Sequence, residues 1–334
     1  MGAASFDRAV FATVHSLRVR DLSAVPPGLA QSNERERAVA YLLLSLSAIS
    51  WSGNAIAARL AVGEISPMAL ISLRWSVVAI LVLLIWKRQI LEALPVLRRH
   101  WLFIAVLGTV GLTGFNTLFY VAAYHTTATQ LSILQGCIPI FVLIGAAAAY
   151  RTPARPMQIV GIAITIFGVL LVAIDGDIRS LRSISFNRGD LMMVVGCVCY
   201  SMYTIALHVR PKIPAIVFFA GVAMAAFLSS LPLLAVEVAA NSFQWPTPKG
   251  WVILVVVAIF PTFLAQIWFM RGVQLIGPTR AGLFANLVPI LGPLFAVGLL
   301  GESFAFNQAI ALILVIGGIF IAEPRSRTAA IPPA

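Results

Sequence analysis

Charged residues are scarce in this chain. Asp, Glu, Lys and Arg make up 10% of its 334 residues and hydrophobic residues make up 60%, whereas roughly 25% of the residues in an ordinary soluble domain are charged. A soluble protein of this length could not cover so apolar a surface with groups that water solvates well. The composition therefore excludes a soluble globular protein and predicts an integral membrane protein.

Cysteine and histidine are also rare. The three cysteines are Cys137, in an apolar run, and Cys197 and Cys199, which point in different directions if they lie on one helix. We interpret all three as small apolar side chains and expect neither disulfides nor a metal site. No Ser-His-Asp arrangement, metal-ligand cluster or Gly-rich phosphate loop is recognisable. The sequence therefore predicts a protein that is not an enzyme and needs no cofactor.

The chain does contain many long apolar runs. A helix needs about 20 mainly apolar residues to cross a bilayer. Ten such runs are present, at residues 39–60, 67–86, 101–123, 128–149, 156–174, 189–208, 214–236, 250–271, 279–300 and 306–322. They predict an all-α integral membrane protein with ten transmembrane helices.

The segments outside these runs set the expected orientation. Residues 1–38 hold no apolar stretch long enough for a signal peptide, so we expect a cytoplasmic tail that is disordered or lies on the membrane surface. Residues 323–334 are the expected C-terminal tail, and 175–188 the longest loop. With the N-terminus inside, 17 of the 23 Lys and Arg residues fall on the cytoplasmic side, as the positive-inside rule requires. Both termini are therefore predicted to be cytoplasmic, and the net charge of +11 indicates lipid headgroups as partners and not nucleic acid.

The second half of the chain repeats features of the first. A shift of 150 residues pairs Asn116 with Gln266, Thr129 with Thr279, Pro139 with Pro289, Gln158 with Gln308 and Gly168 with Gly318. A shift of 149 residues pairs Trp51, Ser52 and Asn54 with Tyr200, Ser201 and Tyr203. Each half, 39–174 and 189–322, holds five spans, an odd number, so the two repeats must be inverted relative to each other. Many secondary transporters have this plan, with the substrate site near the midplane between the halves.

Pro139 and Pro289 each lie near the middle of a predicted span. Proline inside a helix removes one backbone hydrogen bond and clashes with the carbonyl four residues back, at a cost of ~3 kcal/mol. We expect two kinked helices that face each other across the pseudo-twofold axis and act as hinges. The same shift pairs Gly111 with Pro261, a second set of hinge positions. The alternative is that these prolines only shape the helices, since proline is frequent in membrane helices.

Two stretches resemble a known family. WSGNAIAARLAVGEISPMALISLRW (51–75) resembles the first two helices of the drug/metabolite transporter superfamily, in its EamA-type ten-helix branch, through Trp51, Gly53, Asn54, Pro67 and Arg74. Residues 277–322 resemble the closing part of the same family, which includes Gly301 and Glu302. The first half departs from the pattern, because Tyr150-Arg151-Thr152 stands where a Gly-Glu would be. The chain is most similar to YddG-type exporters, and this implies export of aromatic and other neutral amino acids across a bacterial inner membrane.

Polar and aromatic side chains near mid-depth are the candidates for substrate binding. They are Trp51, Asn54, Asn116, Gln135, Tyr200, Tyr203, Gln266 and Asn286. Together they would line a chamber with amides and hydroxyls and no full charge, which suits a neutral, zwitterionic or amphiphilic molecule. For each residue the alternative is a hydrogen bond between helices.

Arg74 is the one charged side chain well inside a predicted span. It lies seven residues after Pro67, or about 10 Å of helix rise. At this shallow depth a long side chain can reach outward, to loop carbonyls or to Glu64. A charge inside a membrane span is by default a candidate functional group, but this outward reach favours a structural or gating role for Arg74.

Acidic residues are absent from the middle of every predicted span, and Asp190, Glu237 and Glu302 lie near span ends. A proton-coupled carrier needs a buried titratable group, and an exporter of cationic drugs needs an acidic one. We therefore predict an alternating-access exporter of small amphiphilic metabolites, most of all neutral amino acids, driven by the substrate gradient and functional as a monomer. The alternatives are a multidrug exporter of cationic or lipophilic compounds and a membrane protein that transports nothing.

Overall fold

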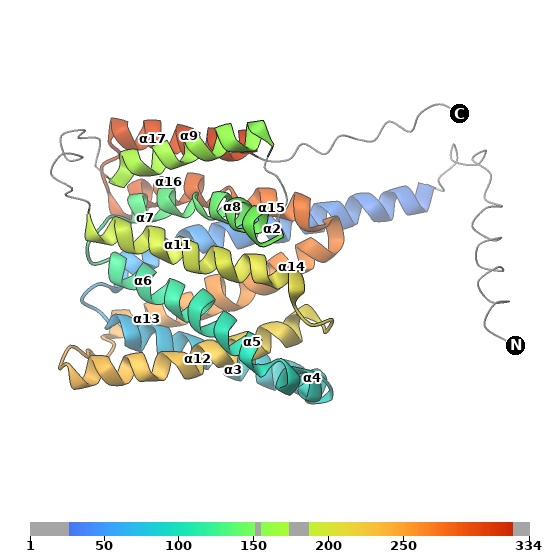
Figure 1. Ribbon diagram of the computed structural model, residues 1–334. Helices are drawn as coiled ribbons and strands as arrows, with labels where there is room; N and C mark the ends of the chain where they lie inside the picture. Colours follow the sequence, from blue (N-terminus) through green and yellow to red (C-terminus); the bar gives the residue numbers. More distant parts are fainter. Residues whose placement is uncertain (1–26, 151–154, 174–186, 323–334) are drawn as a thin grey trace, which may run out of the picture.

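The computed structural model describes residues 27–150, 155–173 and 187–322. In these ranges every regular element is a helix, and the long helices run side by side in one bundle (Figure 1). The first half contains α2 (Pro27–Ala61), α3 (Pro67–Glu92), α4 (Leu94–Arg99), α5 (Trp101–Val106), η1 (Leu107–Gly114), α6 (Phe115–Ala122), α7 (Ala128–Gln135), α8 (Ile138–Tyr150) and α9 (Pro156–Ala173). The second half contains α11 (Arg188–Ala206), η2 (Leu207–Val209), α12 (Ala215–Ala239), α13 (Pro248–Val257), η3 (Ala258–Leu264), α14 (Ala265–Ile276), α15 (Pro278–Ala285), α16 (Val288–Leu300) and α17 (Phe306–Ala322).

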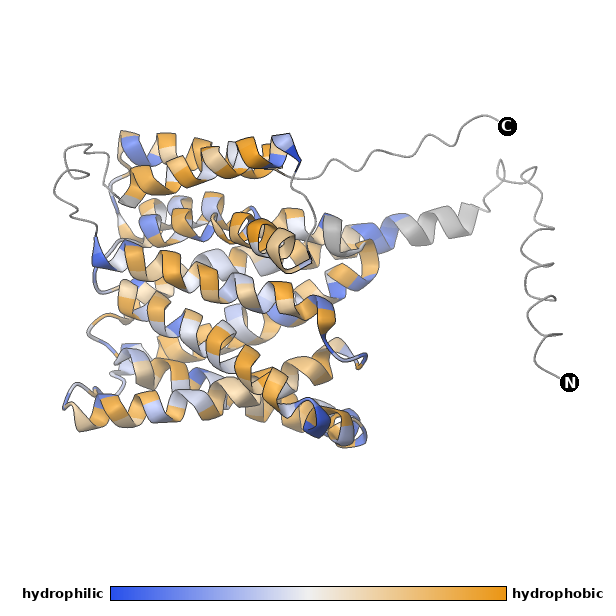
Figure 2. Ribbon diagram, in the orientation of Figure 1, coloured by the Kyte–Doolittle hydropathy of each residue, from blue (hydrophilic) through white to orange (hydrophobic). Residues whose placement is uncertain are grey.

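Eight helical stretches of the described residues are long and apolar enough to cross a membrane. Two more, Pro156–Val172 and Phe306–Ala322, are apolar but shorter. Hydrophobic residues cover the lengths of the helices, whereas hydrophilic residues gather at the two ends of the bundle (Figure 2). The prediction of an all-α membrane protein is confirmed. The crossing of the membrane by all ten helices and the cytoplasmic position of both termini stay predictions.

The first helix begins earlier than the apolar run indicates. α2 starts at Pro27, within the segment 1–38 that the sequence predicts to be a tail. The residues Glu34–Arg37 are good helix formers, so the helix can continue beyond its apolar part. Residues 1–26, all of the loop 175–188 except its last two residues, and the tail 323–334 lie outside the described residues. Arg151 and Thr152, which stand where the family pattern has Gly-Glu, also lie outside the described residues.

Two spans are broken in the middle, and the breaks share one register. The first lies between α7 and α8, at residues 136–137, and the second between α15 and α16, at residues 286–287. The same four backbone hydrogen bonds occur in both breaks, at positions 150 residues apart. In the first break the N–H→O=C pairs are Gly136→Ile133, Cys137→Leu134, Ile140→Cys137 and Phe141→Cys137. In the second they are Asn286→Leu283, Leu287→Phe284, Ile290→Leu287 and Leu291→Leu287.

The prolines begin helices and do not lie inside them. Pro139 and Pro289 are the second residues of α8 and α16. A residue in the first turn of a helix has no intrahelical partner for its N–H, so proline loses nothing there. The expected kink through a lost hydrogen bond in a continuous helix is therefore wrong. Each span is two helices joined by a two-residue turn, and the ~3 kcal/mol cost of an interior proline does not arise.

The third and eighth spans each contain a π-helical segment. These segments are η1, which includes Gly111, and η3, which includes Pro261. The second pair of predicted hinge positions thus falls in two irregular stretches at matching places in the two halves. In η3 the Thr262 hydroxyl donates to the carbonyl of Val257, five residues back, at 2.7 Å. Insertions of this kind are rare in helices and occur mostly at functional sites.

Two helix pairs form opposite edges of the bundle. α9 lies along α17 at one edge, and α3 lies along α12 at the other (Figure 1). A methyl group on Gly161 would lie 2.4 Å from the carbonyl oxygen of Gly318, so only glycine allows this approach. The Thr165 hydroxyl lies 3.5 Å from the carbonyl oxygen of Val315, the residue 150 positions later. Contact between such equivalent positions is what a twofold axis between two halves produces.

The broken helices meet each other unequally. α7 packs along α16, and the side chain of Ser132 fills the space beside Gly292. No comparable contact joins α8 and α15, the other parts of the same two spans, in the described part of the chain. The two halves are therefore closer together at one end of the broken helices than at the other.

Candidate functional site: a polar network between the two halves

Arg74 is buried between the halves. Its side chain on α3 is 4% exposed. Nη1 donates to Asn116 Oδ1 at 2.9 Å and to the Tyr120 hydroxyl at 2.7 Å, and Nη2 donates to Thr262 Oγ1 at 2.5 Å. Asn116 and Tyr120 are four residues apart on α6 and so share one face. Thr262 comes from η3, which makes Arg74 a direct link between the halves.

The network extends beyond the guanidinium. The Tyr120 hydroxyl donates to Asn54 Oδ1 on α2 at 2.8 Å, and Asn116 Nδ2 donates to the carbonyl of Leu112 in η1 at 2.6 Å. Asn116 is buried, whereas Asn54 is half-buried. Both π-helical segments therefore supply groups to the network.

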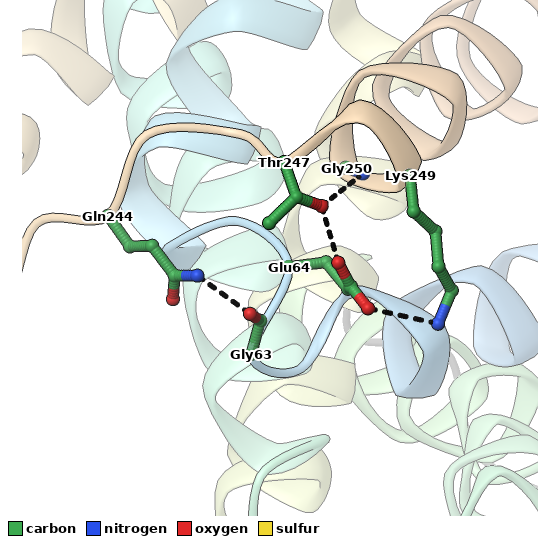
Figure 3. A network of polar contacts seen from close by, with 6 residues as sticks. All are labelled: Gly63, Glu64, Gln244, Thr247, Lys249 and Gly250. Atoms are coloured by element: carbon green, nitrogen blue, oxygen red, sulfur yellow. Dashed lines mark hydrogen bonds and ion pairs between the residues drawn. The ribbon is translucent and has the colours of Figure 1, made fainter.

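Glu64 is not the partner of Arg74. Its Oε2 accepts from the Thr247 hydroxyl, and its Oε1 lies 3.1 Å from Lys249 Nζ (Figure 3). The expectation that Arg74 reaches outward to Glu64 or to loop carbonyls is therefore wrong. The inward direction has a physical reason, because Asn116, Tyr120 and Thr262 offer three acceptors within the bundle.

The aromatic candidates lie close to the two π-helical segments. Trp51 Nε1 donates to the carbonyl of Pro261 at 3.1 Å, the carbonyl that precedes Thr262. Tyr200 and Tyr203 lie with ring centroids 5.6 Å apart on α11. Tyr203 also closes against η1, since a methyl group on Gly111 would lie 2.4 Å from Tyr203 Cβ.

Three predicted amides, like the two tyrosines of α11, make no hydrogen bond to the network among the described residues. Gln135, Gln266 and Asn286 are half-buried. Gln135 Nε2 donates to the carbonyl of Leu131 on its own helix, at 3.4 Å. Among the described residues no hydrogen bond joins these three amides to Arg74 or its partners, so the structure unites only part of the predicted lining.

Tyr120 and Thr262 were not among the predicted site residues. Tyr120 could have been found, because it follows Asn116 by one helical turn. Thr262 carried no signal in the sequence, because its place depends on the π-helical segment of η3.

One end of the bundle is held together by carboxylates. Glu64, after α2, binds Thr247 and Lys249 at the start of α13, and Gln244 Nε2 donates to the carbonyl of Gly63 at 2.6 Å (Figure 3). The Thr247 hydroxyl and the Lys249 ammonium group lower the pKa of Glu64. These bonds join the first half to the second.

Three more carboxylates make bonds between the halves at this end. Glu237 accepts from two backbone N–H groups in the first turn of α3, at 3.2 and 3.3 Å. Glu302 accepts from two N–H groups in the first turn of α7, both at 2.9 Å. Asp190 accepts from the Thr126 hydroxyl at 2.5 Å. A carboxylate at a helix N-terminus satisfies free N–H groups and the positive end of the helix dipole. We call this end, with Glu64, Asp190, Glu237 and Glu302, the carboxylate end.

The comparisons with known proteins agree with this architecture. The signature of the EamA-like transporter family matches residues 38–174 and again residues 187–322. The chain belongs to the EamA-like transporter family. Within the described residues, no cluster of three or more His, Cys, Asp or Glu side chains could hold a metal ion.

Similar proteins cover most of the chain. An uncharacterized transporter of Bacillus subtilis, YyaM, is 28% identical over 85% of this chain and 93% of its own length. An uncharacterized transporter of Archaeoglobus fulgidus is 24% identical over 84% of this chain and 96% of its own length. A solved crystal structure has the same fold, with a TM-score of 0.61 at 20% identity, over 85% of this chain and 96% of that one. The transporter class and the fold are thereby established.

Proposed function

We propose that this transporter exports small amphiphilic metabolites, above all aromatic and other neutral amino acids, by alternating access across a bacterial inner membrane. The observation that carries the proposal is the polar and aromatic network between the halves, from Trp51 and Asn54 through Tyr120 to Arg74. A site at the interface of two related halves is where carriers of this plan bind substrate. Its aromatic rings suit an apolar side chain, and its amides and hydroxyls suit a polar head.

The remaining predicted lining residues belong to the same proposal. Gln135, Gln266 and Asn286 are half-buried amides in the broken or irregular spans. In the proposed cycle they face the substrate, and so do Asn116, Tyr200 and Tyr203. The chain works as a monomer in this proposal, because both halves of the site come from one chain.

The unequal contacts of the broken helices support alternating access. α7 and α16 are packed together, and the four carboxylates tie the halves at the carboxylate end. α8 and α15 make no such contact among the described residues. We therefore assign this conformation to a state that is closed at the carboxylate end, which the distribution of Lys and Arg places outside the cell.

The two breaks and the two π-helical segments supply the proposed hinges. A two-residue turn between α7 and α8, and another between α15 and α16, lets each half-helix change direction without breaking a continuous ladder of hydrogen bonds. Pro139 and Pro289 fix where the second helix of each pair begins. Gly111 and Pro261 are the hinges of the third and eighth spans.

Flux measurements with purified protein test the proposal. Liposomes that contain the protein are loaded with unlabelled amino acid, and uptake of radiolabelled phenylalanine, leucine and threonine is followed, with protein-free liposomes as the control. We expect exchange of the aromatic and aliphatic amino acids that persists without a pH gradient, because the network contains no carboxylate to carry a proton. Absence of exchange for every amino acid would contradict the proposed substrate class.

The second candidate, a multidrug exporter of cationic or lipophilic compounds, fits the network less well. Arg74 is positively charged and its partners are neutral. A cationic drug would be repelled there. The same liposomes loaded with ethidium distinguish the two candidates, since only the multidrug exporter would release it.

A further inference from the structure

We propose that the guanidinium of Arg74 binds an anionic oxygen group of the transported molecule, so that the substrates carry a carboxylate or a related oxyanion. This inference rests on the proposed function and names the chemistry of its site. In this inference Arg74 binds the charged head of the substrate, whereas the aromatic rings contact its apolar part.

The first observation is that the charge of Arg74 is not compensated. The ion pairs among the described residues are Arg88–Glu92 and Lys249–Glu64, and neither involves Arg74. The groups that accept from Arg74 are an amide oxygen and two hydroxyls. A buried charge without an opposite charge is costly, and within a membrane such a group is usually kept for function.

The second observation is an excess of buried donors. Arg74 Nε and Trp75 Nε1 are both buried and have no hydrogen-bond partner in the described part of the chain. The two residues are neighbours on α3, and Arg74 Cζ lies 5.5 Å from the centre of the Trp75 ring. Both groups can only donate. Buried groups without a partner are rare in native proteins, and two adjacent unused donors indicate a missing acceptor.

The geometry of the guanidinium fits a carboxylate. A guanidinium has five N–H groups, and three of them are used by Asn116, Tyr120 and Thr262. One N–H of Nη2 and the N–H of Nε remain. Carboxylates bind guanidinium groups through two parallel N–H···O bonds, which a single carboxylate can form with two such donors.

The network also provides an approach to this charge. Tyr120 joins Arg74 to Asn54, which is half-buried. A methyl group on the neighbouring Gly53 would have no other atom within 4 Å. The Tyr120 hydroxyl therefore lies between the half-buried Asn54 and the guanidinium, and a substrate head that approaches from Asn54 would meet this hydroxyl first. Molecules without an anionic group would leave the donors unpaired, so we expect the site to reject them.

Thermal unfolding of the purified protein tests the inference independently of transport. The probes are 3-phenylpropionate and 3-phenylpropionamide, which differ in the negative charge, and sodium chloride serves as the inorganic anion. We expect the carboxylate to raise the midpoint temperature and the amide to leave it unchanged, since only a ligand that binds the folded state stabilises it. Equal effects of the acid and the amide, or of chloride and the acid, would overturn the inference.

The matched variants are Arg74→Gln and, as control, Arg271→Gln, which removes an exposed guanidinium that bonds Gln274 on α14. We expect Arg74→Gln to weaken binding of the carboxylate about tenfold or more and the control to bind it normally. An Arg74→Gln protein that unfolds cooperatively and still prefers the acid would overturn the inference.

A second variant covers the case in which Arg74→Gln does not fold. Asn116→Asp places a carboxylate 2.9 Å from Nη1, and so supplies the missing charge from within. The aspartate cannot donate to the Leu112 carbonyl as Asn116 does, so the readout is the response to the ligand, and we expect no rise in the midpoint temperature with 3-phenylpropionate. A rise as large as that of the unmutated protein would contradict the inference. In the flux assay, equal exchange of phenylalanine and phenylalaninamide would overturn this inference alone, whereas absence of all exchange would overturn the proposed function.

Discussion

A charged guanidinium is costly to bury in a membrane protein, and Arg74 is held without an acidic partner among the described residues. Three neutral oxygens and the faces of Trp75 and Tyr120, each with its ring centre 5.5 Å from Cζ, take the place of water. Cation–π contacts of desolvated groups contribute up to ~2 kcal/mol. Each neutral acceptor is therefore important for stability.

Replacement of Thr262 by valine should lower stability, because it leaves Arg74 Nη2 without its acceptor. We expect a loss of about 1–3 kcal/mol in the free energy of unfolding. Thr117→Val is the matched control, since the Thr117 hydroxyl is buried on α6 without a partner among the described residues. Thermal unfolding in detergent should show a lower midpoint for the first variant and an unchanged or higher one for the second. Equal midpoints would show that the bond to Thr262 contributes nothing.

At this scale the sequence predicted residue types better than contacts. Asn54 and Asn116 could be predicted, because amides are unusual in long apolar helices. The direction of Arg74 could not be predicted, because a long side chain reaches either outward or inward, and the acceptors of the inward choice come from two elements, α6 and η3. Thr262 joins the network only through the π-helical segment, which one-dimensional periodicity does not indicate.

Among the elements, η1 has little room around it. A methyl group on Gly111 would lie 2.4 Å from Tyr203 Cβ, whereas one on Gly298 of α16 would meet nothing within 4 Å. Gly111→Ala should therefore cost about 1–3 kcal/mol through crowding, and Gly298→Ala should gain up to ~1 kcal/mol of helix propensity. The two variants add the same methyl group, and thermal unfolding should show a lower midpoint for Gly111→Ala and a higher one for Gly298→Ala. Tolerance of alanine at position 111 would contradict the close contact.

The positions of the prolines lead to a different prediction from that of an interior kink. Pro139→Ala and Pro289→Ala should change stability by less than ~1 kcal/mol, because both residues lie in a first helical turn. Pro232→Ala, inside α12, is the control and should raise stability, because a missing hydrogen bond returns.

The same two variants test the hinges through turnover. If the breaks are hinges, each variant should slow exchange in liposomes, and the two should favour opposite access states. Labelling of single cysteines from each side of the membrane reports these states. Normal turnover in both variants would leave the prolines as features of helix packing only.

The places of the apolar helices could be predicted from apolar runs, whereas the breaks within two of them could not. Pro139 correctly marked an irregular point. The sequence did not show that the helix ends at Gln135, before the proline, because Gly136, which caps the helix, is a residue that is also frequent inside membrane helices. The repeat at 150 residues was the better guide, since it placed the second break once the first was known.

Across the whole molecule, acidic groups join the two halves at one end. The pKa of Glu64 is lowered by the Thr247 hydroxyl and by Lys249. The contact therefore has its full strength above the ordinary pKa of a glutamate, and it weakens as the pH falls toward and through the lowered value. The ion pair with Lys249 is exposed, so salt weakens it further.

Glu64→Gln should loosen the carboxylate end at neutral pH, as acid does in the unmutated protein. A cysteine at position 132, where Ser132 is buried against Gly292, reports opening through its reaction with an impermeant maleimide. The three native cysteines are replaced, and rates are normalised to a cysteine at the exposed position 245. We expect faster labelling in Glu64→Gln and no change in Glu92→Gln, which breaks an exposed pair of α3. Unchanged labelling in Glu64→Gln would rule out this contact as part of the closure.

The pair of α9 and α17 has a consequence for biosynthesis. α17 is the last described helix, and the positions in contact, Thr165 and Val315, are 150 residues apart. At 5–20 residues per second a ribosome needs roughly 10–30 s to make the intervening chain. During that interval the face of α9 that carries Gly161 and Thr165 lies against lipid or the insertion machinery. A nascent chain therefore completes this edge of the bundle only when α17 is released, and a chain that ends before residue 306 leaves this face of α9 exposed to membrane proteases.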